Sequence, residues 1–184
     1  MIHTRTFRRS AVVVAVASAL ALLAASCSSG GDTQADGEDG ATPGAPAAEA
    51  APLDFSATQL SGEPFEGSEL EGADTVLWFW APWCTSCRAE APDVVEAAGD
   101  FEGSVEIVGV PGRGEVAEMD GFVADTGTGS LRHVVDEDGA IWRDYGIIGQ
   151  PAFAFVDDDG AAEVFVGGLG YEQLTARMQE LADS

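Results

Sequence analysis

The sequence predicts an α/β domain with a mixed central sheet flanked by helices and with an N-terminal hairpin extension. Two observations support this fold class. Apolar runs of strand length alternate with segments whose apolar residues recur at helical spacing, and the chain ends in a strand–turn–strand pattern followed by a helix. A third observation locates the chemistry, because Cys84 and Cys87 directly follow the apolar run at 75–80. We therefore expect the domain to be organised around residues 79–87.

The first half of the domain is predicted to contain a hairpin, a strand and a helix. The hairpin begins near Leu53, and its strands flank a turn at Ser61-Gly62. A buried strand follows over residues 75–80, and Ala81-Pro82 ends it. A helix is then predicted from Cys84 to about Gly99, with one buried face made of Cys87, Ala91, Val94, Val95 and Ala98.

The second half is predicted to complete the sheet and to cover it. The expected order is a strand over 105–110, a helix from 116 that the glycines at 127–129 end, a short strand over 133–136, a short helix over 141–145, strands over 152–156 and 163–166 joined by a turn, and a closing helix. The closing helix places four large residues on one face: Tyr171, Leu174, Met178 and Leu181. The segment 111–114 is interpreted as a plain turn, with the lining of a substrate groove as the alternative.

The spacing of Cys84 and Cys87 is typical of a reversible dithiol. Cys84 is expected near the N-terminus of a helix, where unpaired backbone N–H groups and the positive end of the helix dipole favour a thiolate. We therefore predict that Cys84 attacks and that Cys87 resolves the mixed disulfide. The alternative is half of a zinc site, but the chain offers only Cys27, His3 and His133 as further ligands. We expect neither a metal nor a cofactor.

The first 26 residues are predicted to be a signal peptide of the lipoprotein type. Arg5, Arg8 and Arg9 form a positive segment before an apolar run at 11–25, which is short for a membrane-spanning helix. The residues up to Cys27 resemble a bacterial lipoprotein signal, and the resemblance implies that Cys27 is lipidated. Cleavage by an ordinary signal peptidase and an uncleaved anchor are the alternatives. All three place the domain outside the cytoplasm.

Residues 27–52 are predicted to form a disordered acidic tether rich in Ala, Gly and Pro, and residues 53–184 to form the domain. The tether holds no aromatic or large aliphatic residue, so it cannot bury enough apolar surface to offset the entropy of ordering. The whole chain has 32 acidic residues against eight arginines and no lysine. Such a composition argues against nucleic acid as a partner, because that function requires basic patches.

Two motifs carry a resemblance to a known family. Trp83-Cys84-Thr85-Ser86-Cys87 and Gln150-Pro151-Ala152-Phe153 resemble the thioredoxin superfamily, and among its members the extracytoplasmic TlpA/ResA/DsbE-type redoxins, closest in look to secreted actinobacterial DsbE-like proteins. The resemblance covers about residues 53–182 and implies a thioredoxin-like fold. It also implies a cis-Pro151 beside the disulfide, a Gln150 backbone that pairs with an extended substrate, and a Trp83 that borders the site. A trans proline that begins an edge strand is the alternative.

Glu90 is the third candidate catalytic residue. It lies three residues after Cys87 on the predicted helix and interrupts an apolar face, so burial is expected to raise its pKa and let it exchange a proton with Cys87. Thioredoxins proper carry a buried acid at the place that Trp78 occupies here, and ResA-type redoxins carry a glutamate at the spacing of Glu90. The alternative is a glutamate on the helix surface.

The predicted function is that of an exported thiol–disulfide oxidoreductase that acts on envelope or secreted proteins. Its expected partners are protein thiols or disulfides, a membrane or extracytoplasmic redox partner, and the outer face of the cytoplasmic membrane, to which a lipid anchor holds it. Secretion is the alternative location, and a monomer is expected. The alternative functions are a specific envelope disulfide reductase of the cytochrome c maturation type and a redox-inactive binding module. The threonine-rich loop of a peroxidase is missing from the sequence.

Overall fold

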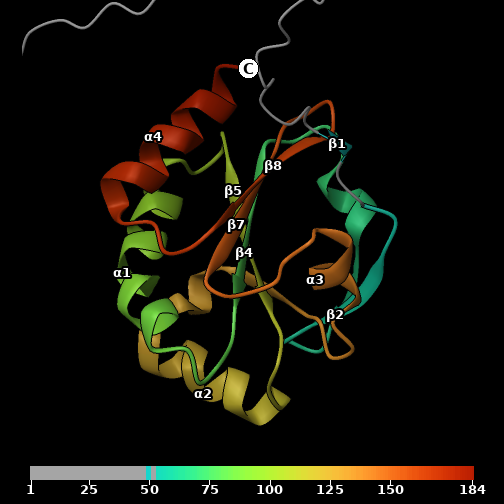
Figure 1. The fold of residues 1–184 in the computed structure, drawn as a ribbon, viewed down its shortest axis with the longest axis vertical. Helices are drawn as coiled ribbons and strands as arrows, with labels where there is room; N and C mark the ends of the chain where they lie inside the picture. The colour runs from blue at the N-terminus through green and yellow to red at the C-terminus, as the bar shows by residue number, and fades with distance from the viewer. Residues whose placement is uncertain (1–48, 51–52) are drawn as a thin grey trace, which may run out of the picture. The chain divides into compact units, whose positions relative to one another are not determined.

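A computed structural model describes residues 49–50 and 53–184 of the chain. Within these residues one eight-stranded sheet has the order β1-β8-β7-β4-β5-β6-β2-β3 (Figure 1). Its strands are β1 (Glu49–Ala50), β2 (Ser56–Gln59), β3 (Pro64–Glu66), β4 (Thr75–Trp80), β5 (Glu106–Pro111), β6 (Arg132–Val135), β7 (Ala152–Val156) and β8 (Ala161–Val166). The helices are α1 (Thr85–Asp100), α2 (Val116–Thr126), α3 (Ala140–Asp144) and α4 (Tyr171–Ala182), with 3-10 turns η1 (Gly67–Leu70) and η2 (Thr128–Ser130).

Several predictions concern residues outside this range. The predicted signal peptide, the predicted lipidation site Cys27 and the predicted tether at 27–48 and 51–52 lie outside the described residues. The last part of the predicted tether contains β1, whose Glu49 and Ala50 pair with Ala162 and Ala161 of β8. No helix of the described part of the chain is long and apolar enough to cross a membrane.

The central strand β4 organises the mixed α/β sheet that the sequence predicts. It pairs in parallel with β5 and antiparallel with β7, and all six of its residues are buried. Because side chains alternate along a strand, Trp78 and Trp80 face the cluster covered by α1, α2 and α4, whereas Leu77 and Phe79 face the cluster under α3 and the hairpin. Helices on both faces of the sheet are visible in Figure 1. The strand that precedes the cysteines is therefore fixed from both sides.

Helix α1 follows β4 within one residue of the predicted bounds but with a different buried face. Val94, Ala91 and Cys87 are buried as predicted, whereas Val95 and Ala98 are only half-buried. Ala97 and Glu90 take the buried places instead. Val95, Ala97 and Ala98 are all apolar and lie close together near the end of the helix. The sequence therefore did not determine which of them face the core, because a small alanine fits a buried position as well as a half-buried one.

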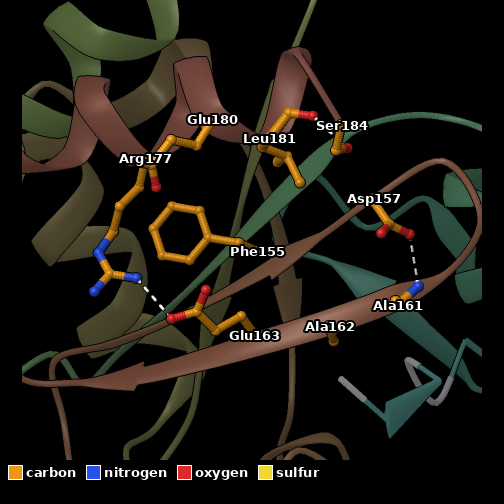
Figure 2. A pocket seen from close by; sticks show the side chains of 9 residues that line it. All are labelled: Phe155, Asp157, Ala161, Ala162, Glu163, Arg177, Glu180, Leu181 and Ser184. Atoms are coloured by element: carbon orange, nitrogen blue, oxygen red, sulfur yellow. Dashed lines mark hydrogen bonds and ion pairs between the residues drawn. The ribbon is translucent and has the colours of Figure 1, made fainter. Parts of the chain in front are cut away.

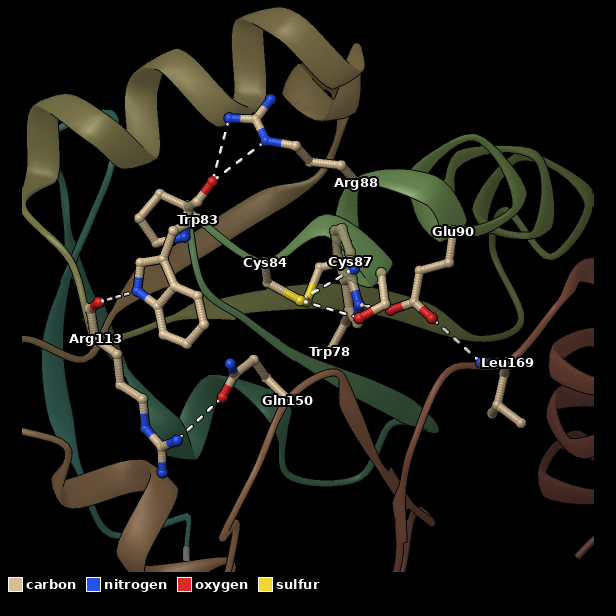
Figure 3. Close-up of a disulfide and its surroundings, with 11 residues drawn as sticks. Trp78, Trp83, Cys84, Cys87, Arg88, Glu90, Arg113, Gln150 and Leu169 are labelled. Atoms are coloured by element: carbon tan, nitrogen blue, oxygen red, sulfur yellow. Dashed lines mark hydrogen bonds between the residues drawn. A yellow bond between two sulfur atoms is a disulfide. The ribbon is translucent and has the colours of Figure 1, made fainter.

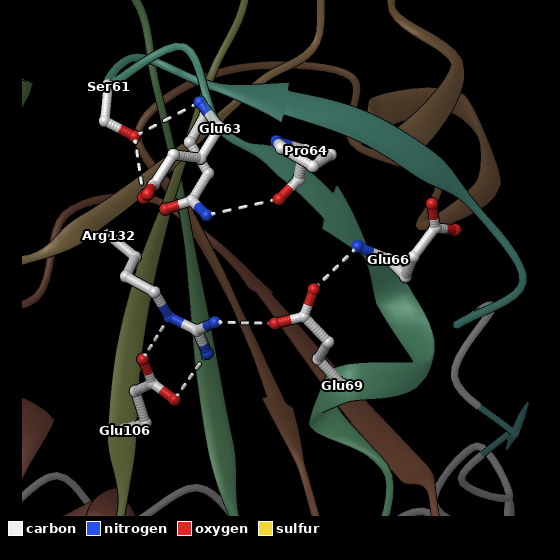
Figure 4. Close-up of polar contacts among 8 residues, drawn as sticks. Ser61, Glu63, Pro64, Glu66, Glu69, Glu106 and Arg132 are labelled. Atoms are coloured by element: carbon white, nitrogen blue, oxygen red, sulfur yellow. Dashed lines mark hydrogen bonds and ion pairs between the residues drawn. The ribbon is translucent and has the colours of Figure 1, made fainter.

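The leading hairpin is part of the sheet. Strand β2 pairs with β3 across the predicted turn and also with β6, where Thr58 lies opposite Val135. Arg132 of β6 reinforces this edge, because its Nε and Nη2 donate to both carboxylate oxygens of Glu106 at 2.7 Å and its Nη1 donates to Glu69 at 3.3 Å (Figure 4). Exposed ion pairs of this kind contribute little stability, so backbone pairing is the main link.

Helix α4 packs against α1 and β7 on one face of the sheet. Leu174, Met178 and Leu181 are buried as predicted, and Tyr171 is half-buried. Arg177 crosses from α4 to β8, where its Nη1 donates to Glu163 at 2.9 Å beside a hollow of about 220 Å³ (Figure 2). This pair lies on α4 and β8 and not on the elements that carry the cysteines.

Candidate active site

A disulfide joins Cys84 and Cys87 where β4 passes into α1 (Figure 3). Cys84 is the N-cap of α1, and its Sγ accepts a hydrogen bond from the backbone N–H of Cys87 at 3.1 Å. The hydroxyl of Ser86 lies 3.4 Å from the same sulfur. Backbone N–H groups at a helix N-terminus stabilise a negative charge, so this geometry favours a thiolate on Cys84 once the disulfide is reduced.

The two sulfurs differ in their access to solvent. Cys84 is 4% exposed, whereas Cys87 is fully buried among the core residues beneath α1. The side chain of Trp83, immediately before Cys84, is 59% exposed. Of the two cysteines, only Cys84 has any exposed surface.

Arg88 fixes the turn that presents Cys84. Its Nε and Nη2 donate to the carbonyl oxygen of Pro82 at 3.3 and 3.2 Å, and its Nη1 pairs with Asp125 at 3.2 Å. The guanidinium also lies 5.0 Å from the ring centre of Phe122 in α2. Sequence reasoning did not identify this role, because nothing local in the sequence links Arg88 to a carbonyl six residues earlier.

Glu90 is buried, which differs from the alternative of a surface glutamate. The residue is 7% exposed, and its carboxylate accepts two hydrogen bonds, one from the indole N–H of Trp78 at 2.8 Å and one from the backbone N–H of Leu169 at 3.2 Å (Figure 3). Burial raises the pKa of Glu90 from 4.5 to about 7, although both hydrogen bonds act in the opposite direction. The group can therefore hold or release a proton near neutral pH.

Trp78 supplies a hydrogen-bond donor, which an ionised acid at its position would not. It is fully buried on β4, and its ring lies 5.9 Å from Trp80 and 6.0 Å from Phe122, so packing fixes the direction of its N–H. Sequence reasoning noted Trp78 only as the residue in place of a buried acid. The structure adds that Trp78 donates to the acid that lies on the neighbouring helix.

The Gln150–Pro151 peptide bond is cis, as the family resemblance implied. The carbonyl of Pro151 accepts from the N–H of Gly167 at 2.9 Å. A Cβ at Gly168 would lie 3.0 Å from Glu90 Oε2 and 3.7 Å from Pro151 Cγ, so this glycine lies between the two candidate residues. The segment 167–169 thus links Pro151 to Glu90, a connection that no sequence motif announces.

Trp83 and Gln150 are linked through Arg113. The indole N–H of Trp83 donates to the carbonyl of Arg113 at 2.7 Å, and Arg113 Nη1 donates to Gln150 Oε1 at 3.0 Å.

His133 lies apart from this group, buried with Nε2 3.0 Å from the carbonyl oxygen of Thr128. In the described residues no group of three or more His, Cys, Asp or Glu side chains is placed to hold a metal ion.

Comparison with known proteins identifies a family and several relatives that are similar in sequence. The AhpC/TSA family profile matches residues 47–164. The chain is 39% identical to the soluble secreted antigen MPT53 of Mycobacterium tuberculosis over 133 residues. The aligned region covers 70% of this chain and 75% of MPT53. Over 141 residues it is 33% identical to the thiol-disulfide oxidoreductase ResA of Oceanobacillus iheyensis, covering 73% and 72%.

Two solved structures share the fold at similar identity. The structure of MTB DsbF in mixed oxidized and reduced forms matches with a TM-score of 0.69 and 41% identity, covering 71% of this chain and 97% of that one. A secreted Mycobacterium tuberculosis disulfide oxidoreductase homologous to E. coli DsbE matches with a TM-score of 0.66 and 38% identity, covering 70% and 97%. The sheet and helices described above are thus a thioredoxin-like fold.

Proposed function

Because this chain belongs to the AhpC/TSA family and is a thioredoxin-like thiol–disulfide oxidoreductase, we propose that Cys84 exchanges disulfides with polypeptides and that Cys87 resolves the mixed disulfide. One observation carries this assignment. Cys84 Sγ is the N-cap acceptor of α1, and Cys84 is 4% exposed, whereas Cys87 is fully buried. An attacking thiolate needs both stabilisation and access, and Cys84 has both.

The exchange balances in electrons and protons. The Cys84 thiolate attacks one sulfur of a polypeptide disulfide, an S–S bond forms, and the other polypeptide sulfur leaves as a thiolate that takes a proton. The Cys87 thiol then loses its proton and attacks Cys84 Sγ, which releases the second polypeptide thiol. Two electrons pass from the dithiol to the polypeptide, and the reverse sequence oxidises a polypeptide dithiol.

Glu90 serves in this proposal as the proton carrier for Cys87. Support comes from its position one helical turn after Cys87, its burial, and a pKa raised to about 7. A carboxyl group with this pKa can accept the proton of the Cys87 thiol when the dithiol acts and return it when the disulfide is reduced.

Trp83, Gln150 and Pro151 are proposed to bind the polypeptide substrate. The exposed Trp83 directly precedes Cys84, and the backbone of Gln150 is proposed to pair with the main chain of an extended substrate. Main-chain hydrogen bonds do not depend on side-chain identity, so one site accepts many extended segments.

The protein is extracytoplasmic, in keeping with relatives described as secreted. We propose that lipidation of Cys27 anchors it to the outer face of the cytoplasmic membrane, with plain secretion as the alternative, and that it works as a monomer with a membrane or extracytoplasmic redox partner. Fractionation of cells that express the full chain tests the anchor. Membrane association that is lost in Cys27→Ala supports lipidation, and a soluble wild-type protein contradicts it.

The reduction potential of the dithiol determines the direction of exchange. A potential near that of thioredoxin, about −270 mV, makes the protein a reductase, and one near that of DsbA, about −120 mV, makes it an oxidase. The disulfide oxidoreductase homologous to E. coli DsbE and the thiol-disulfide oxidoreductase ResA are named for exchange in either direction, so the potential of this dithiol is the quantity to measure. Equilibration of the purified domain with glutathione or dithiothreitol buffers gives this value. The same assay tests the activity, because Cys84→Ser must abolish exchange with a disulfide-containing polypeptide.

A further inference from the structure

The loop after β5 is more than the plain turn predicted from the sequence. It is packed on both sides, since a Cβ at Gly112 would lie 2.8 Å from Trp142 Nε1 and one at Gly114 would lie 2.4 Å from Pro82 Cγ. Between them Arg113 has φ +57°, and it alone among the non-glycine residues of the described chain has a positive φ. A side chain in this conformation is unfavourable, so its retention requires an explanation from its contacts.

Arg113 joins three segments around the cysteines (Figure 3). Its carbonyl oxygen accepts the indole N–H of Trp83 at 2.7 Å. Its guanidinium donates to Gln150 Oε1 at 3.0 Å and to the carbonyl of Ile148 at 3.3 Å, and it stacks 4.6 Å from the ring centre of Trp142. None of the hydrogen bonds of Arg113 in the described part of the chain involves Cys84 or Cys87.

The residues that Arg113 holds are unusually exposed for their type. Trp83 is 59% exposed and Ile148 is 85% exposed, and they belong to the few large apolar side chains of the described residues that face solvent. Arg113 forms a hydrogen bond with each of them. Its carbonyl oxygen accepts from the indole N–H of Trp83, and its guanidinium donates to the carbonyl of Ile148. A polypeptide whose sulfur reaches Cys84 must pass next to Trp83.

We propose that Arg113 is a positioning residue that ties the Cys84 motif to the Gln150-Pro151 segment and so sets how tightly a polypeptide disulfide binds. This inference rests on the proposed function. Trp83, Ile148 and Gln150 form the proposed substrate-binding wall, and Arg113 is the residue that holds them in place. The planar guanidinium can donate to Gln150 and Ile148 at once, which a lysine ammonium cannot do with the same geometry. A wall that is already ordered loses less conformational entropy when a polypeptide binds to it.

Steady-state kinetics with a synthetic peptide that carries one disulfide tests this link, with dithiothreitol as the reductant that regenerates the Cys84/Cys87 dithiol after each turnover. The direct reduction of the peptide by dithiothreitol is measured separately and subtracted. Arg113→Gly removes the guanidinium, keeps the carbonyl that Trp83 uses, and suits the positive φ. We expect KM to rise about tenfold, which corresponds to about 1.4 kcal/mol of binding, while kcat changes less than about twofold. Arg113→Lys should raise KM nearly as much. The matched control is Arg177→Gln, which removes the same charge on α4 and should leave KM unchanged.

Two kinetic results would overturn the inference. An unchanged KM in Arg113→Gly would show that the tie does not affect binding. A KM in Arg113→Lys equal to that of the wild type, with a raised KM in Arg113→Gly, would show that charge attracts the substrate and the fork geometry is unimportant. If Arg113→Gly does not fold, Arg113→Lys alone decides, with a raised KM in support and an unchanged KM against.

A second readout separates this inference from the proposed function. NMR relaxation of the Trp83 indole N–H reports the order of the wall without any substrate. We expect its order parameter to fall in both Arg113 variants and to stay unchanged in Arg177→Gln. A wild-type protein that exchanges no disulfides contradicts the proposed function, whereas a Trp83 order parameter that does not respond to Arg113 contradicts the tie.

Discussion

Replacing Glu90 with glutamine tests the proton carrier directly. The substitution keeps the shape of the side chain but removes the titrating group and one of its two acceptor oxygens. Trp78 Nε1 and Leu169 N both donate to the carboxylate, so an amide can satisfy only one of them. One buried N–H donor is left without a partner, which we predict lowers the free energy of unfolding by about 1–3 kcal/mol.

The pH dependence of stability gives a second predicted change in the free energy of unfolding, which arises from the titration of Glu90. The pKa of Glu90 is about 7 in the folded protein against 4.5 for the ordinary group, so the folded state holds this proton more tightly than the unfolded state does. The contribution of Glu90 to stability is therefore full below about 4.5 and is lost as pH rises through about 7. The full gap corresponds to a loss on the order of 3 kcal/mol, which solvent screening of the partly solvated group reduces.

Urea denaturation with the disulfide intact measures this loss. The difference in unfolding free energy between wild type and Glu90→Gln isolates Glu90, because the many other acids of the chain are common to both proteins. We predict that the difference shrinks as pH rises from about 4.5 to about 7. The matched control is Glu96→Gln, which removes an exposed glutamate from the same helix.

The kinetic assay is reduction of the Cys84–Cys87 disulfide by dithiothreitol, with rates expressed per dithiothreitol thiolate. Protonated Glu90 delivers a proton to the departing Cys87 sulfur, so the wild-type rate should fall as pH rises through about 7. Below this pH we predict that Glu90→Gln reacts about tenfold more slowly, which is less than most general acids contribute because a thiolate is already a good leaving group. Identical pH profiles for the two proteins would refute the reasoning and remove Glu90 from the mechanism.

Two further predictions concern residues that act on this site. Trp78→Phe removes the indole donor to Glu90, so the pKa of Glu90 should rise further, and the inflection of the dithiothreitol profile should move to higher pH; an unmoved inflection would show that the 2.8 Å bond does not tune the carboxyl group. Arg88→Met removes both donors to the carbonyl of Pro82, and it should lower the free energy of unfolding in urea by about 1 kcal/mol, against no change if solvent replaces these bonds.

Much of the fold was accessible from local patterns. The apolar run of β4, the helical spacing after Cys84 and the glycine that ends α2 each determine one element, and the structure confirms all three. Gly127 has φ +72°, as a C-cap in the left-handed region requires. The cis bond before Pro151 was also expected, although from family resemblance and not from the residues alone.

The partners of the site residues were not accessible, because they are distant in sequence. Glu90 is bound by Trp78 twelve residues before it and by Leu169 far after it. Arg113 reaches Gln150 across 37 residues. Such contacts depend on how the strands are ordered in the sheet, and no local spacing encodes that order. Sequence analysis could therefore propose Glu90 but could not say what holds it.

The central claim is that Cys84 is the attacking sulfur, and trapping the mixed disulfide tests it most directly. In Cys87→Ser the resolving thiol is missing, so a peptide disulfide should accumulate as a covalent adduct on Cys84, which mass spectrometry of proteolytic fragments locates. In Cys84→Ser no adduct should form, since Cys87 is fully buried. An adduct on Cys87 at a comparable rate, or exchange activity that survives in Cys84→Ser, would contradict the account.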